Sequence, residues 1–280
     1  MLKDFFKLNS PYESLDKASL INRMEASKHV CNVLYEPDAL SEEKFDRVKF
    51  ENVSFSKTMI SNMTFIGCIF KNCLFIGTHF NSVSFHNCKF ENCNFFKAKF
   101  QSVYARPSQF RKAIQHKKYA NIAVHLYHQL RDNYYDQSQR EYKNEAEYYF
   151  LHWLRKNRVL QAKRNNKKWY MYQPHNFVSF LYDFLFGYGY RMLNLFRATG
   201  SIFLLNIWAN YTFSQYMFTT PVEPSLIKTI YFTVTTMTTL GATGYNPDTD
   251  IGLMFVVFNV IFGMTILSAT VGALFKKILR

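Results

Sequence analysis

The most constraining feature of this 280-residue chain is a large apolar residue, nearly always phenylalanine, at every fifth position from Phe45 to Phe100, with Ile60 at one of these positions. A small or medium side chain stands two residues before most of them, including Cys68, Cys73, Cys88 and Cys93. Neither the 3.6-residue period of a helix nor the two-residue period of a strand produces a period of five. A coil with four sides and one five-residue unit on each side does. We therefore predict stacked coils that bury one continuous apolar column.

This pattern resembles the pentapeptide-repeat family over residues 43–104. The resemblance implies a right-handed quadrilateral β-helix of about three coils, which we expect to follow an N-terminal helical segment over residues 1–42. The four cysteines of the repeat then point inward, where a free thiol behaves as a small hydrophobe. We prefer this interpretation to a metal or disulfide cluster. The repeat has more basic than acidic residues, so the DNA mimicry known in the family is not expected.

Residues 105–175 change to a helical pattern. Apolar residues recur at helical spacing on both sides of residues 132–139, which predicts two antiparallel helices. We expect this segment to be a cytosolic coupler. His125 and His128 could share a helical face and bind a metal, but packing or surface histidines are the favoured interpretation. There is no glycine-rich phosphate loop, nucleophile elbow or acid/base pair, so the sequence gives no evidence for an enzyme.

The formal net charge of +14 is concentrated before the last third of the chain. The segment Lys163–Trp169, "KRNNKKW", is a basic cluster beside an aromatic residue. Because the segment that follows resembles a membrane interface, we expect attraction to an anionic inner leaflet, at about 1 kcal/mol per charge. Binding of nucleic acid is the alternative that this context disfavours. Residues 176–197 are aromatic but interrupted by charges, which predicts an interfacial helix.

Two apolar segments, Ala198–Phe218 and Ile251–Phe275, are long enough to span a bilayer. In the first, Asn206, Asn210 and Gln215 should face protein rather than lipid. Positive charges flank the outer ends of the pair. The positive-inside rule therefore places both termini in the cytoplasm, in a multi-pass protein of the plasma (inner) membrane that we expect to be bacterial. The cysteines should then stay reduced.

The loop between the two spans contains a short apolar helix followed by "TLGAT". The expected helix follows Ser225, a suitable N-cap residue, and is too short to cross a bilayer. Irregular backbone at membrane depth is tolerated only where it is buried in protein or lines water. A helix whose C-terminus points to the membrane centre favours cations there.

This layout resembles the two-transmembrane pore domain of the potassium-channel superfamily, over about residues 195–277, and we assign the pore domain to residues 198–280. The segment "TTLGATGYNPDT" aligns without gaps to the family pattern Thr-Thr-Val-Gly-Tyr-Gly-Asp-x-x-Pro-x-Thr. The resemblance implies a homotetramer, a hinge at Gly263, and an ion selectivity filter. The filter positions are Thr238, Thr239, Leu240, Gly241, Ala242 and Thr243.

The filter departs from the family at Ala242 and Thr243, where the family has Tyr and Gly. Glycine permits the positive φ that turns a carbonyl toward the pore, and β-branched threonine disfavours it. We therefore expect a cation pore that distinguishes potassium weakly from sodium. A potassium-selective pore, or a sodium-selective one, is the alternative. Asp248 and Asp250 either concentrate cations at the mouth or are ordinary loop acids.

Four residues after the expected hinge either line the cavity and gate it or pack against helices and lipid. They are Met264, Leu267, Ser268 and Val271. With no arginine-rich voltage sensor, we expect gating by an unknown cytosolic ligand or protein partner, and no cofactor beyond permeant potassium and sodium ions. A membrane-tethered scaffold is the rival function, and the pore-loop pattern argues against it.

Overall fold

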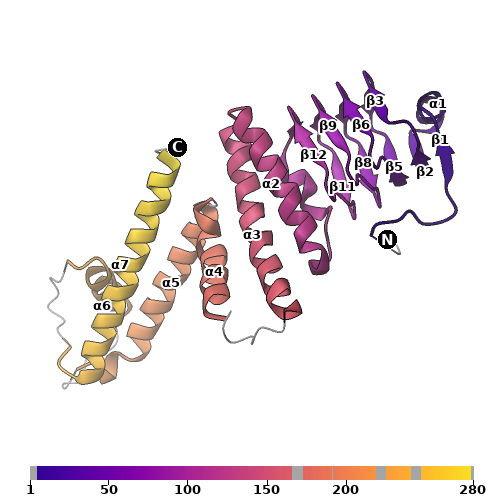
Figure 1. Cartoon of the computed structure of the whole chain (residues 1–280). Coiled ribbons are helices and arrows are strands. Elements are labelled where there is room, and N and C mark those ends of the chain that lie inside the picture. The colour runs from indigo at the N-terminus through magenta and orange to yellow at the C-terminus, as the bar shows by residue number, and fades with distance from the viewer. Residues whose placement is uncertain (1–4, 166–172, 191, 219–224, 241–246, 279–280) are drawn as a thin grey trace. The chain divides into compact units, whose positions relative to one another are not determined.

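The computed structural model describes residues 5–165, 173–190, 192–218, 225–240 and 247–278. The chain divides into two compact units, Met1–Phe177 and Val178–Arg280, each described here by itself. The first unit begins with parallel strands and ends with helices, and the second is helical (Figure 1).

The first unit is built on short parallel strands with one helix, α1 (Lys17–Ser27), inserted between the first two. The strands are β1 (Glu13–Leu15), β2 (His29–Tyr35), β3 (Ala39–Ser41), β4 (Lys44–Asp46), β5 (Lys49–Ser54), β6 (Met59–Ser61), β7 (Thr64–Ile66), β8 (Ile69–Lys71), β9 (His79–Asn81), β10 (Ser84–His86), β11 (Lys89–Glu91), β12 (Lys99–Gln101) and β13 (Tyr104–Ala105).

These strands pair in a register that repeats along the sequence. They form three parallel sheets, ordered β1-β2-β5-β8-β11, β3-β6-β9-β12 and β4-β7-β10-β13. Phe50 pairs with Phe70, and Phe65 pairs with Phe85. A fourth row is made by bridges from Ser54 to Leu74 and from Leu74 to Asn94. Three sheets and one row of bridges in a common register are the pairing expected of a four-sided coil.

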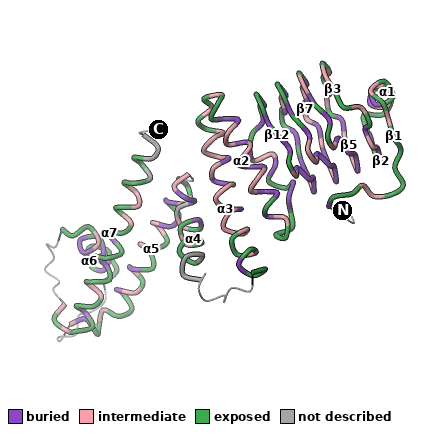
Figure 2. The backbone as a smooth tube through the Cα atoms, in the orientation of Figure 1, coloured by how far each residue is buried: buried purple, intermediate pink, exposed green. Residues whose placement is uncertain are grey.

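The phenylalanines of successive layers stack inside these sheets. Ring centroids lie 4.9 Å apart between Phe50 and Phe70, 4.9 Å between Phe70 and Phe90, and 4.5 Å between Phe90 and Phe110. These phenylalanines are at most 1% exposed, and Figure 2 shows buried positions recurring along the strands. Stacked aromatic pairs add attraction to the burial of their apolar surface. The apolar column predicted from the five-residue period is therefore present, and Phe110 ends it.

The cysteines of the repeat lie in this core as free thiols. Cys68, Cys73, Cys88 and Cys93 are at most 2% exposed, and Cys31 is exposed on β2. The Cys93 Sγ lies 3.3 Å from the carbonyl oxygen of Phe70 in the preceding layer. No group of three metal-ligating side chains occurs among the residues that the structure describes.

Residues with positive φ recur along the strand region, each two positions after an inward-facing residue. Asn52, Asn72 and Asn92 have φ of 57°, 55° and 53°, and Gly67 has φ of 61°. Asparagine and glycine are the residues that adopt this left-handed conformation most readily. These residues let the chain turn while the next inward side chain returns to the core.

The parallel-strand region begins earlier than residue 43, the start expected from the sequence. Strands β2 and β3 pair with β5 and β6, so residues 1–42 contain parallel strands and one helix rather than a helical segment alone. Val30, Tyr35 and Leu40 occupy the inward positions of this first layer and are buried. The expected boundary was too late because these apolar side chains stand where later layers have phenylalanine.

A helical hairpin covers the last layer of strands. It comprises the short 3-10 helices η1 (Pro107–Lys112) and η2 (Lys117–Tyr119), then α2 (Ala120–Asp136) and α3 (Arg140–Arg164). The Asn133 side chain accepts a hydrogen bond from the Val103 N–H and donates one to the Val103 carbonyl, each 2.8 Å long. This amide takes the hydrogen-bonding place of a further strand, so no backbone edge is left open at Val103.

The two histidines considered as metal ligands lie on α2 and have other surroundings. His128 Nδ1 is 3.0 Å from the Asp132 carboxylate on the same helix. Partial burial lowers the pKa of His125. Among the described residues, neither histidine belongs to a group of three side chains that could bind a metal ion.

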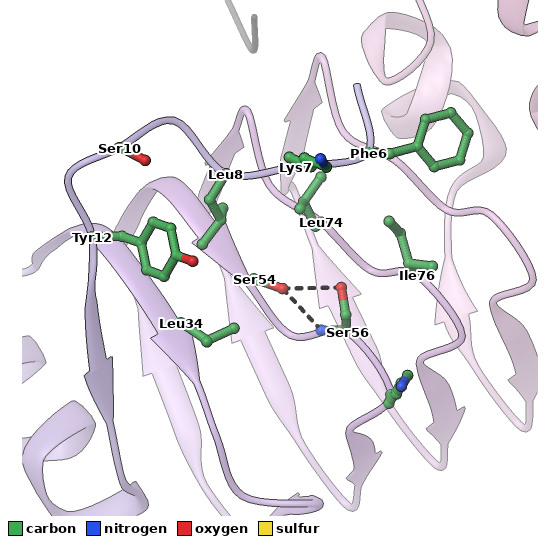
Figure 3. Close-up of a pocket in the computed structure, with 11 residues that line it drawn as sticks. Phe6, Lys7, Leu8, Ser10, Tyr12, Leu34, Ser54, Ser56, Leu74 and Ile76 are labelled. Carbon is green, nitrogen blue, oxygen red and sulfur yellow. Dashed lines mark hydrogen bonds between the residues drawn. The ribbon is translucent and has the colours of Figure 1, made fainter. Parts of the chain in front are cut away.

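An N-terminal strap, residues 5–12, runs along the row of bridges (Figure 3). Asn9 and the side chain of Asn52 exchange two hydrogen bonds of 2.9 Å. Farther along, Asn94 Nδ2 donates to the Phe5 carbonyl at 2.8 Å, and the Phe5 ring stacks on Tyr119 at 4.3 Å. A cavity of about 390 Å³ lies between the strap and the strands. The strap thereby connects the strands to the base of the helical hairpin.

The second unit contains the helices α4 (Gln173–Phe186), which begins just before it, α5 (Met192–Thr212), α6 (Leu226–Met237) and α7 (Asp250–Ile278), with the 3-10 turns η4 (Gly187–Gly189) and η5 (Ser214–Tyr216). Among the described helices, α7 is long and apolar enough to cross a membrane, over Asp250–Gly272.

The boundaries before α6 differ from those expected. The expected interfacial helix over residues 176–197 is interrupted at η4, where Gly187, Tyr188 and Gly189 all have positive φ. The next helix, α5, begins and ends six residues before the expected span Ala198–Phe218. Glycines at this turn permit the left-handed backbone that ends α4.

Candidate functional site

The central element of the candidate site is the short helix α6. Ser225 stands at its N-cap position without a side-chain capping bond, and its carbonyl accepts hydrogen bonds from the Thr229 N–H and hydroxyl, both 2.9 Å. Twelve residues span about 18 Å, less than the ~30 Å hydrocarbon core of a bilayer. The helix is therefore too short to cross a bilayer.

Four threonines of α6 are buried against its neighbours. Thr229, Thr233, Thr235 and Thr236 are each less than 9% exposed. Their hydroxyls donate to carbonyls one turn earlier, as from Thr236 to Phe232 at 2.7 Å. Because these hydroxyls are satisfied within the helix, they can be buried at modest cost.

Two neighbouring helices contact α6 in two layers. In the first layer, Asn259 Nδ2 on α7 donates to Asn210 Oδ1 on α5 at 3.2 Å, and Asn210 Nδ2 donates to the Thr233 hydroxyl on α6 at 2.8 Å. In the second layer, Asn206 Nδ2 on α5 lies 3.9 Å from the Met237 sulfur on α6.

The prediction that Asn206 and Asn210 face protein is confirmed, since they are 7% and 2% exposed. Gln215, in η5, is exposed in this unit instead. Thr233 and Asn259 were not among the site residues expected from the sequence. Asparagines four residues apart in an apolar segment were the available signal for Asn206 and Asn210. A lone asparagine in the most apolar segment was the corresponding signal for Asn259.

Gly263, the expected hinge, completes the second layer of contacts. A Cβ built there would lie 2.0 Å from the Met237 carbonyl oxygen of α6. The helix α7 continues through this position without a break. The structure therefore gives Gly263 a packing role, because any larger residue would push α6 and α7 apart.

The C-terminal end of α6 carries the first three predicted filter residues. The Thr238 hydroxyl donates to the Val234 carbonyl at 2.7 Å, and the Leu240 N–H donates to Thr235 at 3.0 Å. Thr239 has φ of 58°, an uncommon conformation for a β-branched residue. Gly241, Ala242 and Thr243 lie outside the described residues. The strained backbone at Thr239 is a feature that functional sites retain.

The predicted mouth residues flank the start of α7. Asp248 and Asp250 are both exposed. Asp250 lies in the first turn of α7, where its negative charge interacts favourably with the helix dipole. Between them, the Thr249 hydroxyl donates to the Tyr216 carbonyl at 2.7 Å and accepts from the Gly252 N–H at 3.1 Å. Thr249 thus caps α7 and joins it to η5.

The four predicted cavity residues lie on α7 beyond Gly263. Met264, Leu267, Ser268 and Val271 are all exposed in this single chain. Their exposure leaves this face of α7 available for lipid or for further protein.

Comparison with known protein families gives two matches. The family described as "Ion channel" matches residues 192–280, which include α5, α6 and α7. This match supports an ion channel of the potassium-channel superfamily. The family described as "SV2A/B/C luminal domain" matches residues 15–120, which include the parallel strands. No curated protein matches the chain.

Proposed function

We propose that this chain is one subunit of a homotetrameric cation channel that conducts potassium with weak preference over sodium. One observation carries the proposal. Within a region that matches an ion-channel family, a helix too short to cross a membrane leads into Thr238, Thr239 and Leu240. Four such segments around one axis would form a ring of carbonyl oxygens that replaces the hydration shell of a cation.

The filter in this proposal consists of Thr238 to Thr243. The C-terminal carbonyls of α6 direct the negative end of the helix dipole toward it. Asp248 and Asp250 attract cations to the outer mouth. Ala242 cannot brace the filter as tyrosine does, and Thr243 disfavours the glycine conformation. The outer binding sites are therefore weakened, which reduces discrimination between potassium and sodium.

The remaining parts have proposed roles around this pore. The strands form a right-handed quadrilateral β-helix of the pentapeptide-repeat type, in the cytosol, and the hairpin α2–α3 transmits a ligand or partner signal. The basic segment Lys163–Trp169 and the helix α4 lie at the anionic inner leaflet of the plasma membrane. Met264, Leu267, Ser268 and Val271 line the inner cavity.

The test is the reversal potential of purified protein in a bilayer with potassium on one side and sodium on the other. We expect a value near zero, altered or abolished by Thr239→Ala. Thr212→Ala removes an exposed hydroxyl at the end of α5 and serves as the matched control. A reversal near the potassium limit would instead support a potassium-selective channel. No current from correctly assembled protein, with or without cytosolic extract, would support the membrane-tethered scaffold.

A further inference from the structure

The hydrogen bonds that join α5, α6 and α7 form a chain with one direction. Asn259 donates to Asn210, Asn210 donates to Thr233, and the Thr233 hydroxyl donates to the Thr229 carbonyl at 2.7 Å. We call Asn259, Asn210 and Thr233 the amide relay. Bonds that donate in the same direction polarise one another, so each strengthens the next.

The amide relay is almost completely shielded from solvent within the unit. Asn259, Asn210 and Thr233 are 1%, 2% and 0% exposed. Polar side chains at such depth in a membrane segment are costly when they lack partners and mark functional positions when they have them. Simple lipid anchoring does not require a polar chain that joins three helices.

The second layer of contacts lies one helical turn from the relay on each helix. Asn206 precedes Asn210 by four residues, Met237 follows Thr233 by four, and Gly263 follows Asn259 by four. Residues four apart lie on one helix face. The same face of α6 therefore contacts its neighbours at two levels. Thr233 is hydrogen-bonded to Asn210 on α5, and the backbone of α7 at Gly263 lies close to Met237.

We infer that the amide relay is a positioning device that couples the inner helix α7 to α6, the helix that ends in the filter residues. Displacement of α7 then moves Thr238 and Leu240 through Thr233 and Met237, so the filter end responds to the inner helix without a bend at Gly263. The inference deepens the proposed function and rests on it for its consequence in conduction.

The first test compares two substitutions at Thr233 in single-channel recordings of the full-length protein. Thr233→Val keeps the shape and removes the hydroxyl, and Thr233→Ser keeps the hydroxyl. We expect Thr233→Val to change the ratio of open to closed time by roughly threefold to tenfold, the scale of interhelical hydrogen bonds in membranes. Thr233→Ser should restore the wild-type ratio. A change in channel number alone would not alter this ratio.

The matched control is Thr229→Val, one turn earlier on α6. The Thr229 hydroxyl donates to the Ser225 carbonyl of its own helix, so its loss leaves the relay intact. We expect wild-type gating from this variant. The same gating change in Thr229→Val as in Thr233→Val, or none in Thr233→Val, would overturn the inference.

A second measurement does not depend on conduction and separates the inference from the proposed function. Thermal unfolding of the detergent-solubilised full chain is compared for Thr233→Val, Asn259→Leu and the double variant. Since both residues act through Asn210, we expect the double variant to melt close to the less stable single variant. Additive losses would overturn the relay. Non-additive losses from a protein that never conducts would uphold the relay and reject the channel.

Discussion

At the residue scale, single positions with positive φ decide where the chain turns between successive strands. Asn52, Asn72 and Asn92 each stand two residues after an inward phenylalanine and each adopts positive φ. The sequence carries this signal, because asparagine recurs in the same register as phenylalanine. Lys57 and Lys97 adopt the same conformation, although lysine has no such preference.

Gly263 permits a residue-scale prediction that separates packing from hinge motion. Glycine to alanine inside a helix ordinarily stabilises it by roughly 0.5–1 kcal/mol. At Gly263 the new Cβ would collide with the Met237 carbonyl, so Gly263→Ala should instead lower the thermal unfolding midpoint of the detergent-solubilised protein. Gly272→Ala on the same helix is the control, because among the described residues a Cβ there meets no atom within 4 Å beyond its chain neighbours and the backbone of its own helix. If both substitutions stabilise the protein, the packing role of Gly263 would be wrong and the hinge expected from the sequence would be favoured.

Glu51 leads to a prediction about acid stability. Lys49 and Lys71, from adjacent layers, approach its carboxylate at 2.7 Å and 3.0 Å and hold its pKa down at about 2. A carboxyl whose pKa is lower in the folded protein stabilises the fold above its unfolded pKa. This stabilisation is lost as the pH falls from about 4.5 toward about 2.

Glu51→Gln should therefore flatten this part of the pH dependence of unfolding, measured by chemical denaturation of the full chain. Its cost at pH 7 should stay below ~1 kcal/mol, because the pair is partly exposed and screened by solvent. Glu36→Gln, at an exposed position, should retain the wild-type slope. An unchanged slope in Glu51→Gln would contradict the assignment.

At the element scale, the five-residue period predicted the inward phenylalanines because each layer repeats one side-chain environment. The first layer was not predicted, because its inward positions hold Val30, Tyr35 and Leu40 in place of phenylalanine. The amide relay could not be predicted from spacing. Asn210 and Asn259 lie far apart in the sequence, and their contact depends on how three helices pack.

The N-terminal strap provides a prediction for an element that no periodicity indicates. Asn52→Gly keeps the left-handed corner but removes the side chain that bonds both backbone groups of Asn9. We expect the strap to detach more often, so trypsin should cleave after Lys7 several times faster under native conditions. Asn62→Gly is the control, since Asn62 is an exposed corner with φ of 52°. Equal cleavage of the two variants would show that Asn52 does not secure the strap.

At the scale of the whole molecule, charge decides the proposed orientation in the membrane. Arg197 directly precedes the first span expected from the sequence, and Lys276 and Lys277 directly follow the second, while Lys228 is the one basic residue between Ala198 and Phe275. The positive-inside rule therefore favours cytoplasmic termini, with the strands in the cytosol. The family that matches residues 15–120 is described as a luminal domain, and that location is a property of the SV2A/B/C proteins and not of this chain.

The cysteines allow this orientation to be measured without a new label site in the strands. Cys31 is exposed, whereas Cys68, Cys73, Cys88 and Cys93 are buried in the core and should react only on unfolding. A membrane-impermeant maleimide should leave intact cells unlabelled and should label Cys31 once the membrane is permeabilised. Ser225→Cys, at the start of α6, should add a site that reacts in intact cells, since the proposed topology places Ser225 on the external side. Labelling of Cys31 in intact cells would invert the proposed topology and place the strands outside, and Cys31→Ser would confirm which thiol had reacted.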